Sequence, residues 1–361
     1  MTITTRAPGK LFIAGEYAVV EPGHPSILVA VDRFITVSLT DSPDVGHVHS
    51  SEYGRLPVEW RWDAESGEIV VDHHPYDYVT SAIDMMERLR GERSIEPRPF
   101  DLHIESELDD VNGQKYGLGS SAAVVVATIA AINEFYELGL SGLDRFKIAL
   151  LATIAVSPRS SGGDIASSTF GGWISYSSPD RAALLESMAS STVTECLEAD
   201  GWAPLNVKQL PLPSRLRLVV GWTGSPSSTE ALVGSVKKAS PTDSPAYTTF
   251  LANSDRVVHG LTEALESGDP ALAQGLLREA RENLLLLQET SGITIETEKL
   301  KTLCKIAEQH GGAAKPSGAG GGDCGIALTA DGVDLESMRG AWEEAGIRPL
   351  DLTVYEQEVA A

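Results

Sequence analysis

The sequence predicts an α+β protein built of two lobes. Its 361 residues exceed the length at which a single hydrophobic core usually keeps growing. Each half contains both the β-branched runs typical of strands and the longer periodic runs typical of helices. An Ala/Ser-rich and then Pro-rich stretch at 180–212 lies between the halves, as is common for inter-domain connections. We therefore expect a first lobe over residues 1–185 and a second lobe over 186–361.

The first half predicts strands accompanied by buried helices. Residues 10–20 and 27–40 are rich in β-branched residues and predict strands. The helices expected at 116–138 and 146–156 are apolar on nearly every side, which is typical of helices buried in a core. The other elements expected here are a hairpin at 60–72 with its turn near Ser66–Gly67, a helix at 76–90, a strand at 100–108, and a loop followed by a strand at 157–176.

The second half predicts further strands and several amphipathic helices. It opens with an apolar strand at 216–224. Residues 272–288 carry apolar side chains at spacings of three and four and predict an amphipathic helix. A strand at 324–329, a helix at 335–346 and a last strand at 348–357 complete this lobe.

Charge and composition exclude several classes of protein. The formal net charge is −23 and no Lys/Arg-rich stretch occurs, which argues against a nucleic-acid partner. No apolar run reaches the ~18 residues that span a bilayer, and the first residues lack a signal-peptide pattern, so we expect a cytoplasmic protein with no membrane partner. Cys196, Cys304 and Cys324 have neither metal-ligand nor disulfide spacing. His73 and His74 are neighbours that would point to opposite faces of a strand, so we expect no metal there.

The first of three glycine-rich segments is APGKLFIAGEYAVVEPG at 7–23. It places Lys10 beside a Pro-Gly turn at the start of an expected strand, and Glu16 and Tyr17 follow. In so acidic a chain, an anionic substrate requires local cations of this kind. An ordinary edge strand with a lysine extended along its surface is the alternative.

The second segment, GLGSSAAV at 117–124, precedes a long buried helix. A helix N-terminus offers unpaired N–H groups and about half a positive charge, which together favour a phosphate. A serine N-cap after a glycine turn is the simpler alternative, but capping needs only one serine. The residues expected to hold a triphosphate are Gly117, Leu118, Gly119, Ser120, Ser121, Ala122 and Ala123, and either serine could bind Mg²⁺.

The third segment, KPSGAGGGDCGIAL at 315–328, concentrates glycines directly before an expected strand. Glycine lets a backbone approach a ligand closely, at a folding cost of about 0.5–1 kcal/mol per residue. A phosphate-binding loop and a plain flexible loop both fit this composition. GGGDCG matches the dinucleotide fingerprint G-x-G-x-x-G, but that fingerprint requires a following helix, and here a strand follows. No Walker A motif occurs in the chain.

A carboxylate lies between the second and third segments. SSGGDIASS places Asp164 after a Gly-Gly pair and among serines. It could assist a nucleophile or position a lysine. A local turn closed by its own side chain is the alternative.

In this order the segments resemble the motifs of the GHMP kinase superfamily, which includes galactokinase, homoserine kinase, mevalonate kinase and phosphomevalonate kinase. The resemblance extends from Pro8 to the last expected strand. It implies a ribosomal-protein-S5-like first lobe, a ferredoxin-like second lobe and an active site in the cleft between them. It also implies ATP as the phosphoryl donor and Mg²⁺ as the metal. A catalytically silent metabolite sensor of the same fold is an alternative, against which the retention of Lys10 and Asp164 argues.

Within the superfamily the chain most resembles the phosphomevalonate kinase branch. Tyr17 stands where mevalonate kinases usually have a histidine, Asp323 stands where they tend to have a glycine, and residues 220–233 resemble a signature of this branch. The resemblance implies ATP-dependent phosphorylation of 5-phosphomevalonate to 5-diphosphomevalonate in the mevalonate route to isoprenoids. Mevalonate kinase, or another small-molecule kinase of the superfamily, is the first alternative. Whether the protein is a monomer or a homodimer stays open.

The resemblance also assigns roles to residues. It makes Lys10 a contact to the transferred phosphoryl group or to the attacking oxygen, and Asp164 the catalytic aspartate. Mevalonate kinases carry a Mg²⁺-binding glutamate about eleven residues before the aspartate, but the corresponding segment here has no carboxylate. We therefore expect phosphates, water and a serine hydroxyl to hold the ion. The expected substrate contacts are Tyr17, Ser161, Ser228, Lys315, Ser317, Gly318 and Ala319.

Two chemical expectations follow from a phosphorylated acceptor. Its nucleophile is a phosphate oxygen whose second pKa is about 6, so a general base has little to remove, and we expect Asp164 to orient Lys10 and Mg²⁺. The acceptor's charge also requires a cation. Arg159, Lys237, Lys238 and Lys315 lie nearest the motifs, and of these we expect Lys315 to bind the acceptor.

Overall fold

The computed structural model describes residues 2–51, 56–63, 69–71, 77–110, 112–213, 215–225, 229–239 and 244–357. The side chains of 229 and 230 are also outside this description. The hairpin turn expected at Ser66–Gly67, the pair His73–His74 and the substrate contact expected at Ser228 therefore lie outside the described residues. No helix in the described ranges is long and apolar enough to cross a membrane.

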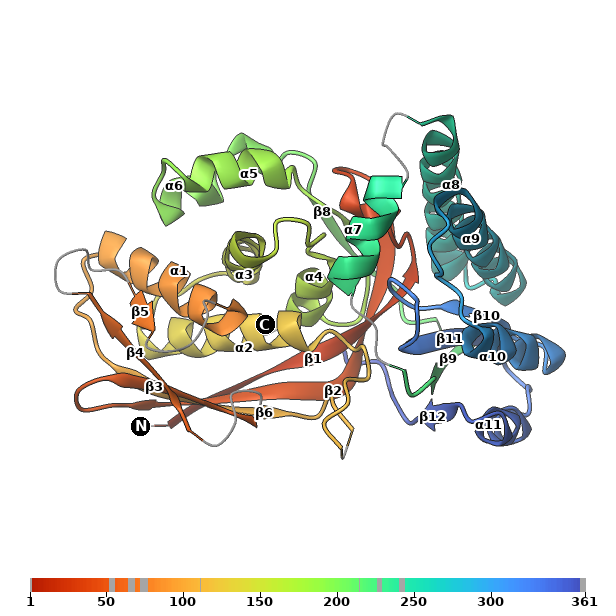
Figure 1. The fold of residues 1–361 in the computed structure, drawn as a ribbon, viewed down its shortest axis with the longest axis horizontal. Coiled ribbons are helices and arrows are strands. Elements are labelled where there is room, and N and C mark those ends of the chain that lie inside the picture. Colours follow the sequence, from red (N-terminus) through yellow and green to blue (C-terminus); the bar gives the residue numbers. More distant parts are fainter. Residues whose placement is uncertain are drawn as a thin grey trace.

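The first lobe is built on an eight-stranded sheet covered on one face by helices (Figure 1). The order is β5-β4-β3-β6-β2-β7-β8, and β1 pairs with β2. The strands are β1 (Thr2–Ala14), β2 (Pro25–Asp41), β3 (Gly46–Ser50), β4 (Val58–Trp62), β5 (Ile69–Val71), β6 (Phe100–Ser106), β7 (Trp173–Ser177) and β8 (Asn206–Leu210). The helices are α1 (Tyr78–Glu92), α2 (Ser120–Phe135), α3 (Gly142–Val156), α4 (Gly163–Phe170), α5 (Arg181–Met188) and α6 (Val193–Leu197), with short 3-10 turns at Ala18–Val20 and Asp200–Trp202.

The second lobe has a four-stranded sheet of order β10-β11-β9-β12. Its strands are β9 (Leu216–Trp222), β10 (Ala313–Pro316), β11 (Cys324–Ala330) and β12 (Arg348–Leu350). Its helices are α7 (Thr229–Ala239), α8 (Pro245–Ser267), α9 (Pro270–Ser291), α10 (Glu298–Gln309) and α11 (Leu335–Glu344). Helices α9 and α10 pack against β10 and β11, whereas α7 lies at the junction with the first lobe (Figure 1).

The structure corrects the expected lobe boundary at 185/186. Strand β8 pairs antiparallel with β7, so the first sheet continues as far as Leu210 and the second begins at Leu216. The last expected strand also differs, because only 348–350 is strand. The chain then returns to the first lobe, where Val354 pairs with Val31. Long-range pairing decides both features, and local composition does not encode it.

Two local expectations near the motifs also differ from the structure. The strand expected at 10–20 ends at Ala14, and a 3-10 turn follows at 18–20. The loop expected to carry Asp164 is partly helical, and Asp164 lies in the first turn of α4. The buried helices and the strand after the glycine-rich loop are confirmed as α2, α3 and β11.

A buried serine joins the two lobes through the main chain of β1. Phe12 N donates to Ser317 Oγ at 3.0 Å, and Ser317 Oγ donates to Phe12 O at 2.9 Å. Ser317 lies directly after β10, so one hydroxyl satisfies two backbone groups of the other lobe. Unpaired buried polar groups are costly, and this bond pair therefore fixes β1 against the glycine-rich loop.

Replacing this serine should loosen the junction between the lobes. We expect Ser317→Ala to lower the free energy of unfolding by about 1–3 kcal/mol, since it leaves two buried backbone groups unpaired. Urea unfolding measures the loss. Ser267→Ala is the matched control, because Ser267 is exposed and bonds only within its own helix; its effect should stay within about 0.5 kcal/mol. Equal effects of the two substitutions would contradict this assignment.

Candidate active site

One cavity of about 360 Å³ lies where the two lobes meet. Six segments line it: the end of β1 with the turn after it, the start of α1, the loop leading into α2, the segment from the end of α3 to the start of α4, α7, and the glycine-rich loop. Of the expected site residues, the cavity brings together Lys10, Tyr17, Gly117, Leu118, Gly119, Ser120, Ser121, Ala122, Ser161, Asp164, Gly318 and Ala319.

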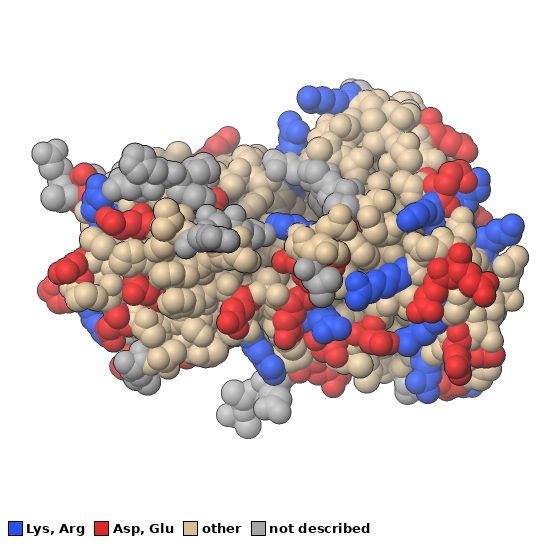
Figure 2. Space-filling model, turned by 60° about the horizontal axis from the view of Figure 1, so that its bottom comes forward, with Lys and Arg blue, Asp and Glu red and all other residues tan. Residues whose placement is uncertain are grey.

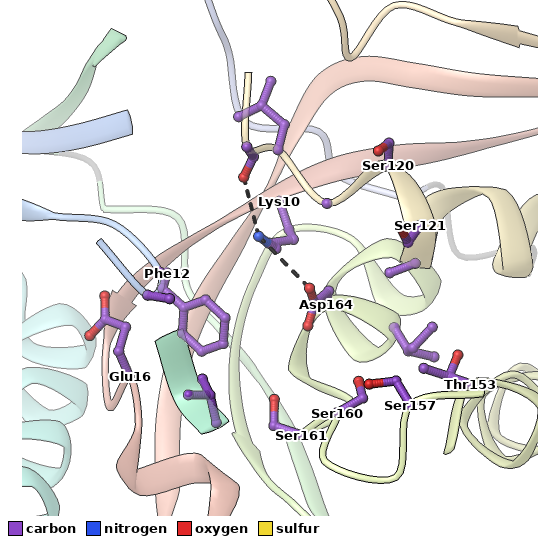
Figure 3. A pocket seen from close by; sticks show the side chains of 18 of the residues that line it. Lys10, Phe12, Glu16, Ser120, Ser121, Thr153, Ser157, Ser160, Ser161 and Asp164 are labelled. Atoms are coloured by element: carbon purple, nitrogen blue, oxygen red, sulfur yellow. Dashed lines mark hydrogen bonds and ion pairs between the residues drawn. The ribbon is translucent and has the colours of Figure 1, made fainter. Parts of the chain in front are cut away.

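Lys10 and Asp164 form an ion pair in the middle of this cavity. Lys10 Nζ lies 3.8 Å from Asp164 Oδ2 and donates to Gly117 O at 3.4 Å (Figure 3). The lysine side chain is 9% exposed and the carboxylate 31% exposed. Gly119 has φ +84°, and a Cβ there would lie 2.9 Å from Lys10 Cε. The glycine of this turn thus leaves the room that the lysine side chain occupies.

The N-terminus of α2 faces the cavity, and its N-cap residue supplies no side-chain cap. Its N-cap residue, Gly119, is left-handed and offers no side-chain hydrogen bond. Ser120 and Ser121 follow in the first helical turn, where no acidic residue occurs. The first N–H groups of the helix and the positive end of its dipole therefore face the cavity, an arrangement that favours an anion.

Hydroxyl groups line the opposite wall of the cavity. Figure 3 shows Ser157, Ser160 and Ser161 on one side of the Lys10–Asp164 pair, with Ser120 and Ser121 on the other. The pair thus lies between a helix N-terminus suited to phosphates and a wall of hydroxyl groups. These hydroxyl groups can donate hydrogen bonds to a polar substrate and accept hydrogen bonds from it.

Buried side chains hold this wall from behind. The Arg181 guanidinium donates to Arg159 O at 3.3 Å, to Ser160 O at 2.9 Å and to Val20 O. Tyr176 Oη donates to Ser161 O at 2.7 Å. Burial lowers the pKa of Arg181 and raises that of Tyr176. Three consecutive carbonyl groups are therefore fixed, and the side chains of the same residues face the cavity.

Tyr17 connects the first motif to the third. Its backbone has φ +62°, which is unusual for a residue other than glycine. Its hydroxyl donates to Ala319 O at 2.6 Å. Burial, and then the charge of Glu16, raises the pKa of this phenol. Tyr17 thus acts as a neutral donor that fixes the loop carrying Ala319.

The structure corrects the role expected for Lys315. Its side chain is fully buried, its Nζ pairs with Glu16, and it donates to Pro316 O at 2.6 Å. Lys315 does not line the cavity, and neither do Ser317 and Ala123. A lysine enclosed by a carboxylate and a carbonyl from the protein has no exposed surface to offer a substrate. We therefore assign no substrate contact to Lys315 or to Ser317, and no phosphate contact to Ala123.

The glycines of the third motif serve packing as well as the cavity. A Cβ on Gly320 would lie 2.2 Å from Ile295 O, and one on Gly322 would lie 2.0 Å from Ser225 O. Both glycines have positive φ, so no other residue fits there without displacement of the main chain. Gly318, by contrast, faces open space and lines the cavity. The expectation that these glycines let a loop approach the ligand therefore applies to Gly318, whereas Gly320 and Gly322 allow close packing of the loop itself.

Several cavity residues were not singled out from the sequence. Thr153 and the C-cap residue Ser157 are polar residues four apart that follow the apolar run 148–152 of α3, a pattern that could have indicated a lined cavity. Lys115 and Val233 also line it, but nothing in their local sequence distinguishes them. The surface gives no stronger guide, because acidic and basic side chains are interspersed over much of the face in Figure 2.

Comparison with known proteins adds independent information. The family model "GHMP kinases N terminal domain" matches residues 77–172, and "GHMP kinases C terminal" matches 261–348. A phosphomevalonate kinase of Streptomyces sp. (strain CL190) is 46% identical, with 98% of this chain and 97% of the relative covered.

Solved structures agree over the whole chain. A Lin0012 protein from Listeria innocua has a TM-score of 0.92 and 36% identity, covering 99% of this chain and 98% of that one. Streptococcus pneumoniae phosphomevalonate kinase in complex with phosphomevalonate and AMPPNP has a TM-score of 0.86 and 27% identity, covering 98% of this chain and 100% of that one.

Substitutions in the buried pair of Glu16 and Lys315 test whether this lysine stabilises the fold or binds a substrate. Lys315→Met leaves Glu16 as an uncompensated buried charge, and we expect it to lower the free energy of unfolding by about 3–5 kcal/mol. The double variant Glu16→Gln with Lys315→Met should regain most of this loss. Urea unfolding of both variants is the measurement.

Lys301→Met is the matched control, because Lys301 pairs with Glu298 at the surface. Its effect should be below about 1 kcal/mol. If Lys315→Met left stability unchanged and only raised the KM of an acceptor, the structural assignment of Lys315 would be wrong.

Proposed function

The chain belongs to the GHMP kinase family, and we propose that it is a phosphomevalonate kinase, which transfers the γ-phosphoryl group of ATP to the phosphate of 5-phosphomevalonate. The position of the Lys10–Asp164 pair carries this proposal, because the pair lies in one cavity between the start of α2 and the serine-lined wall. The 46% identity to a phosphomevalonate kinase supports it, as does the similarity to a structure that contains phosphomevalonate and an ATP analogue.

The start of α2 is the side on which we place the nucleotide. Residues 117–122 would surround the β- and γ-phosphates with main-chain N–H groups. In the described part of the chain, no group of three His, Cys, Asp or Glu side chains could hold a metal alone. This composition suits Mg²⁺, which binds through phosphates and waters, and the hydroxyl of Ser120 or Ser121 would complete its coordination. The ion would neutralise part of the triphosphate charge.

The serine-lined wall is the side on which we place the acceptor. Ser161 lies on this wall, Gly318 and Ala319 line the cavity from the glycine-rich loop, and Tyr17 fixes that loop through Ala319 O. A phosphate oxygen of the acceptor attacks the γ-phosphorus, and the bond to the bridging oxygen breaks, leaving its electron pair on ADP. Lys10 lies where it can neutralise charge on the transferred group. Asp164 holds the Lys10 ammonium in place, so catalysis depends on positioning and electrostatics.

Substrate identity is tested by ADP release from the purified protein with ATP and Mg²⁺. Mevalonate, 5-phosphomevalonate, 5-diphosphomevalonate and homoserine are offered separately. We expect turnover with 5-phosphomevalonate alone. Turnover with mevalonate instead would transfer the assignment to mevalonate kinase, and no turnover with any acceptor would favour a silent member of the family.

Asp164→Asn tests whether this carboxylate orients Lys10 or removes a proton. We expect kcat to fall by about 10²–10³-fold, as for loss of one preorganised electrostatic contact. The dianionic acceptor phosphate is the better nucleophile, so kcat/KM should rise as pH increases through about 6. This rise in kcat/KM reflects ionisation of the acceptor phosphate, so the Asp164→Asn variant should show it as well. If the variant lost the rise and recovered its activity at high pH, Asp164 would be a general base.

A further inference from the structure

Arg159 is a positively charged residue of the cavity whose guanidinium has no structural ion pair in the described ranges. It lies on the serine-lined wall, in the segment between α3 and α4, and it lines the cavity. Its guanidinium forms no ion pair within the described ranges, whereas Lys10 pairs with Asp164 and Lys315 with Glu16. With Lys315 enclosed, Arg159 is the cation that the described residues of this wall offer to an anionic acceptor.

The main chain of Arg159 is held rigidly. Arg181 donates to the carbonyl groups of Arg159 and Ser160, and the amide of Ser160 donates to Ser157 O at 3.0 Å. The position of the Arg159 guanidinium therefore depends on its own side-chain torsions and on what packs beside it. A planar guanidinium suits a carboxylate or a phosphate because it can donate two parallel hydrogen bonds.

Helix α7 of the second lobe supplies the packing partner. A Cβ on Gly234 would lie 2.7 Å from Arg159 Nη1, and among the described side chains no other lies within 4 Å of that point. The preceding residue, Val233, lines the cavity. One turn further along α7, Lys237 pairs with Glu21 of the first lobe at 3.2 Å. Helix α7 thus contacts the first lobe through Lys237, and Gly234, which has no side chain, faces the Arg159 guanidinium.

We propose that the Arg159 guanidinium binds an oxyanion of the acceptor and that Gly234 is a specificity-determining position. Because Gly234 has no side chain, it leaves room for the guanidinium in the position from which it binds. The inference rests on the proposed function for the identity of that acceptor. It makes acceptor affinity depend on a helix of the second lobe, although Arg159 itself belongs to the first. Nucleotide affinity, which depends on the start of α2, stays independent of this contact.

Titration calorimetry on the full-length protein tests the proposal. Phosphomevalonate, mevalonate and AMPPNP are each titrated into wild type, Gly234→Ala, Arg159→Met and the double variant. The added methyl group displaces the end of a flexible side chain, so we expect Gly234→Ala to weaken acceptor binding by about 3–10-fold. Loss of the charged hydrogen bonds in Arg159→Met should weaken it by about 10–100-fold. AMPPNP binding should change less than about 2-fold.

The double variant is the decisive sample. If Gly234 acts through Arg159, the double variant should bind the acceptor no more weakly than Arg159→Met alone. Loss for both acceptors would place the guanidinium on the carboxylate that they share, and loss for phosphomevalonate alone would place it on the phosphate. The proposal is wrong if Gly234→Ala weakens binding equally in the Arg159→Met background, or if AMPPNP weakens in parallel.

Two controls separate this result from other failures. Gly275→Ala also replaces a helical glycine, but nothing lies within 4 Å of its Cβ position, so acceptor affinity should not change. Alanine stabilises a helix by about 1 kcal/mol relative to glycine. Unfolding therefore does not explain a loss of acceptor affinity in Gly234→Ala or in Gly275→Ala. ADP release by the wild type on the same samples judges the proposed function separately. A wild type that binds neither acceptor would overturn both proposals.

Discussion

The buried ion pair between Glu16 and Lys315 joins the two lobes directly behind the cavity. Glu16 lines the cavity from the first lobe, and Lys315 approaches from β10 of the second. Because both side chains are buried, loss of either charge would leave the other unpaired and would lower the free energy of unfolding by several kcal/mol. The pair therefore holds the first and third motifs in one arrangement, which the bonds from Ser317 to Phe12 and from Tyr17 to Ala319 reinforce.

This junction explains how a cavity formed by both lobes can have a defined chemistry. Lys10 and Asp164 belong to the first lobe and are positioned by β1 and α4. Gly318 and Ala319 belong to the second, and their distance from Lys10 depends on the junction. Phosphoryl transfer needs both substrates in line and little covalent participation by the protein. The junction sets the position of Gly318 and Ala319 relative to Lys10, so it contributes to the positioning on which the proposed phosphoryl transfer depends.

The sequence predicts the local features well and the long-range ones poorly. The buried helices, the glycine turn before α2 and the strand after the glycine-rich loop all follow from short patterns. Helix α4 does not, because its eight residues are rich in serine and depend on tertiary packing rather than on helix propensity. The pairing of Lys315 with Glu16 spans 299 residues, and no local pattern distinguishes that lysine from one that binds a substrate. The place of β8 in the first sheet was missed for the same reason.

A crystal structure with AMPPNP, Mg²⁺ and phosphomevalonate would test most directly the claim that the Lys10–Asp164 pair divides a nucleotide side from an acceptor side. We expect the triphosphate on the N-terminus of α2, the reacting phosphate of the acceptor beside Lys10, and the rest of the acceptor along the wall that contains Ser161. The Glu16–Lys315 pair should remain closed. Acceptor density at the start of α2, or Lys315 released from Glu16 to contact the acceptor, would contradict the account.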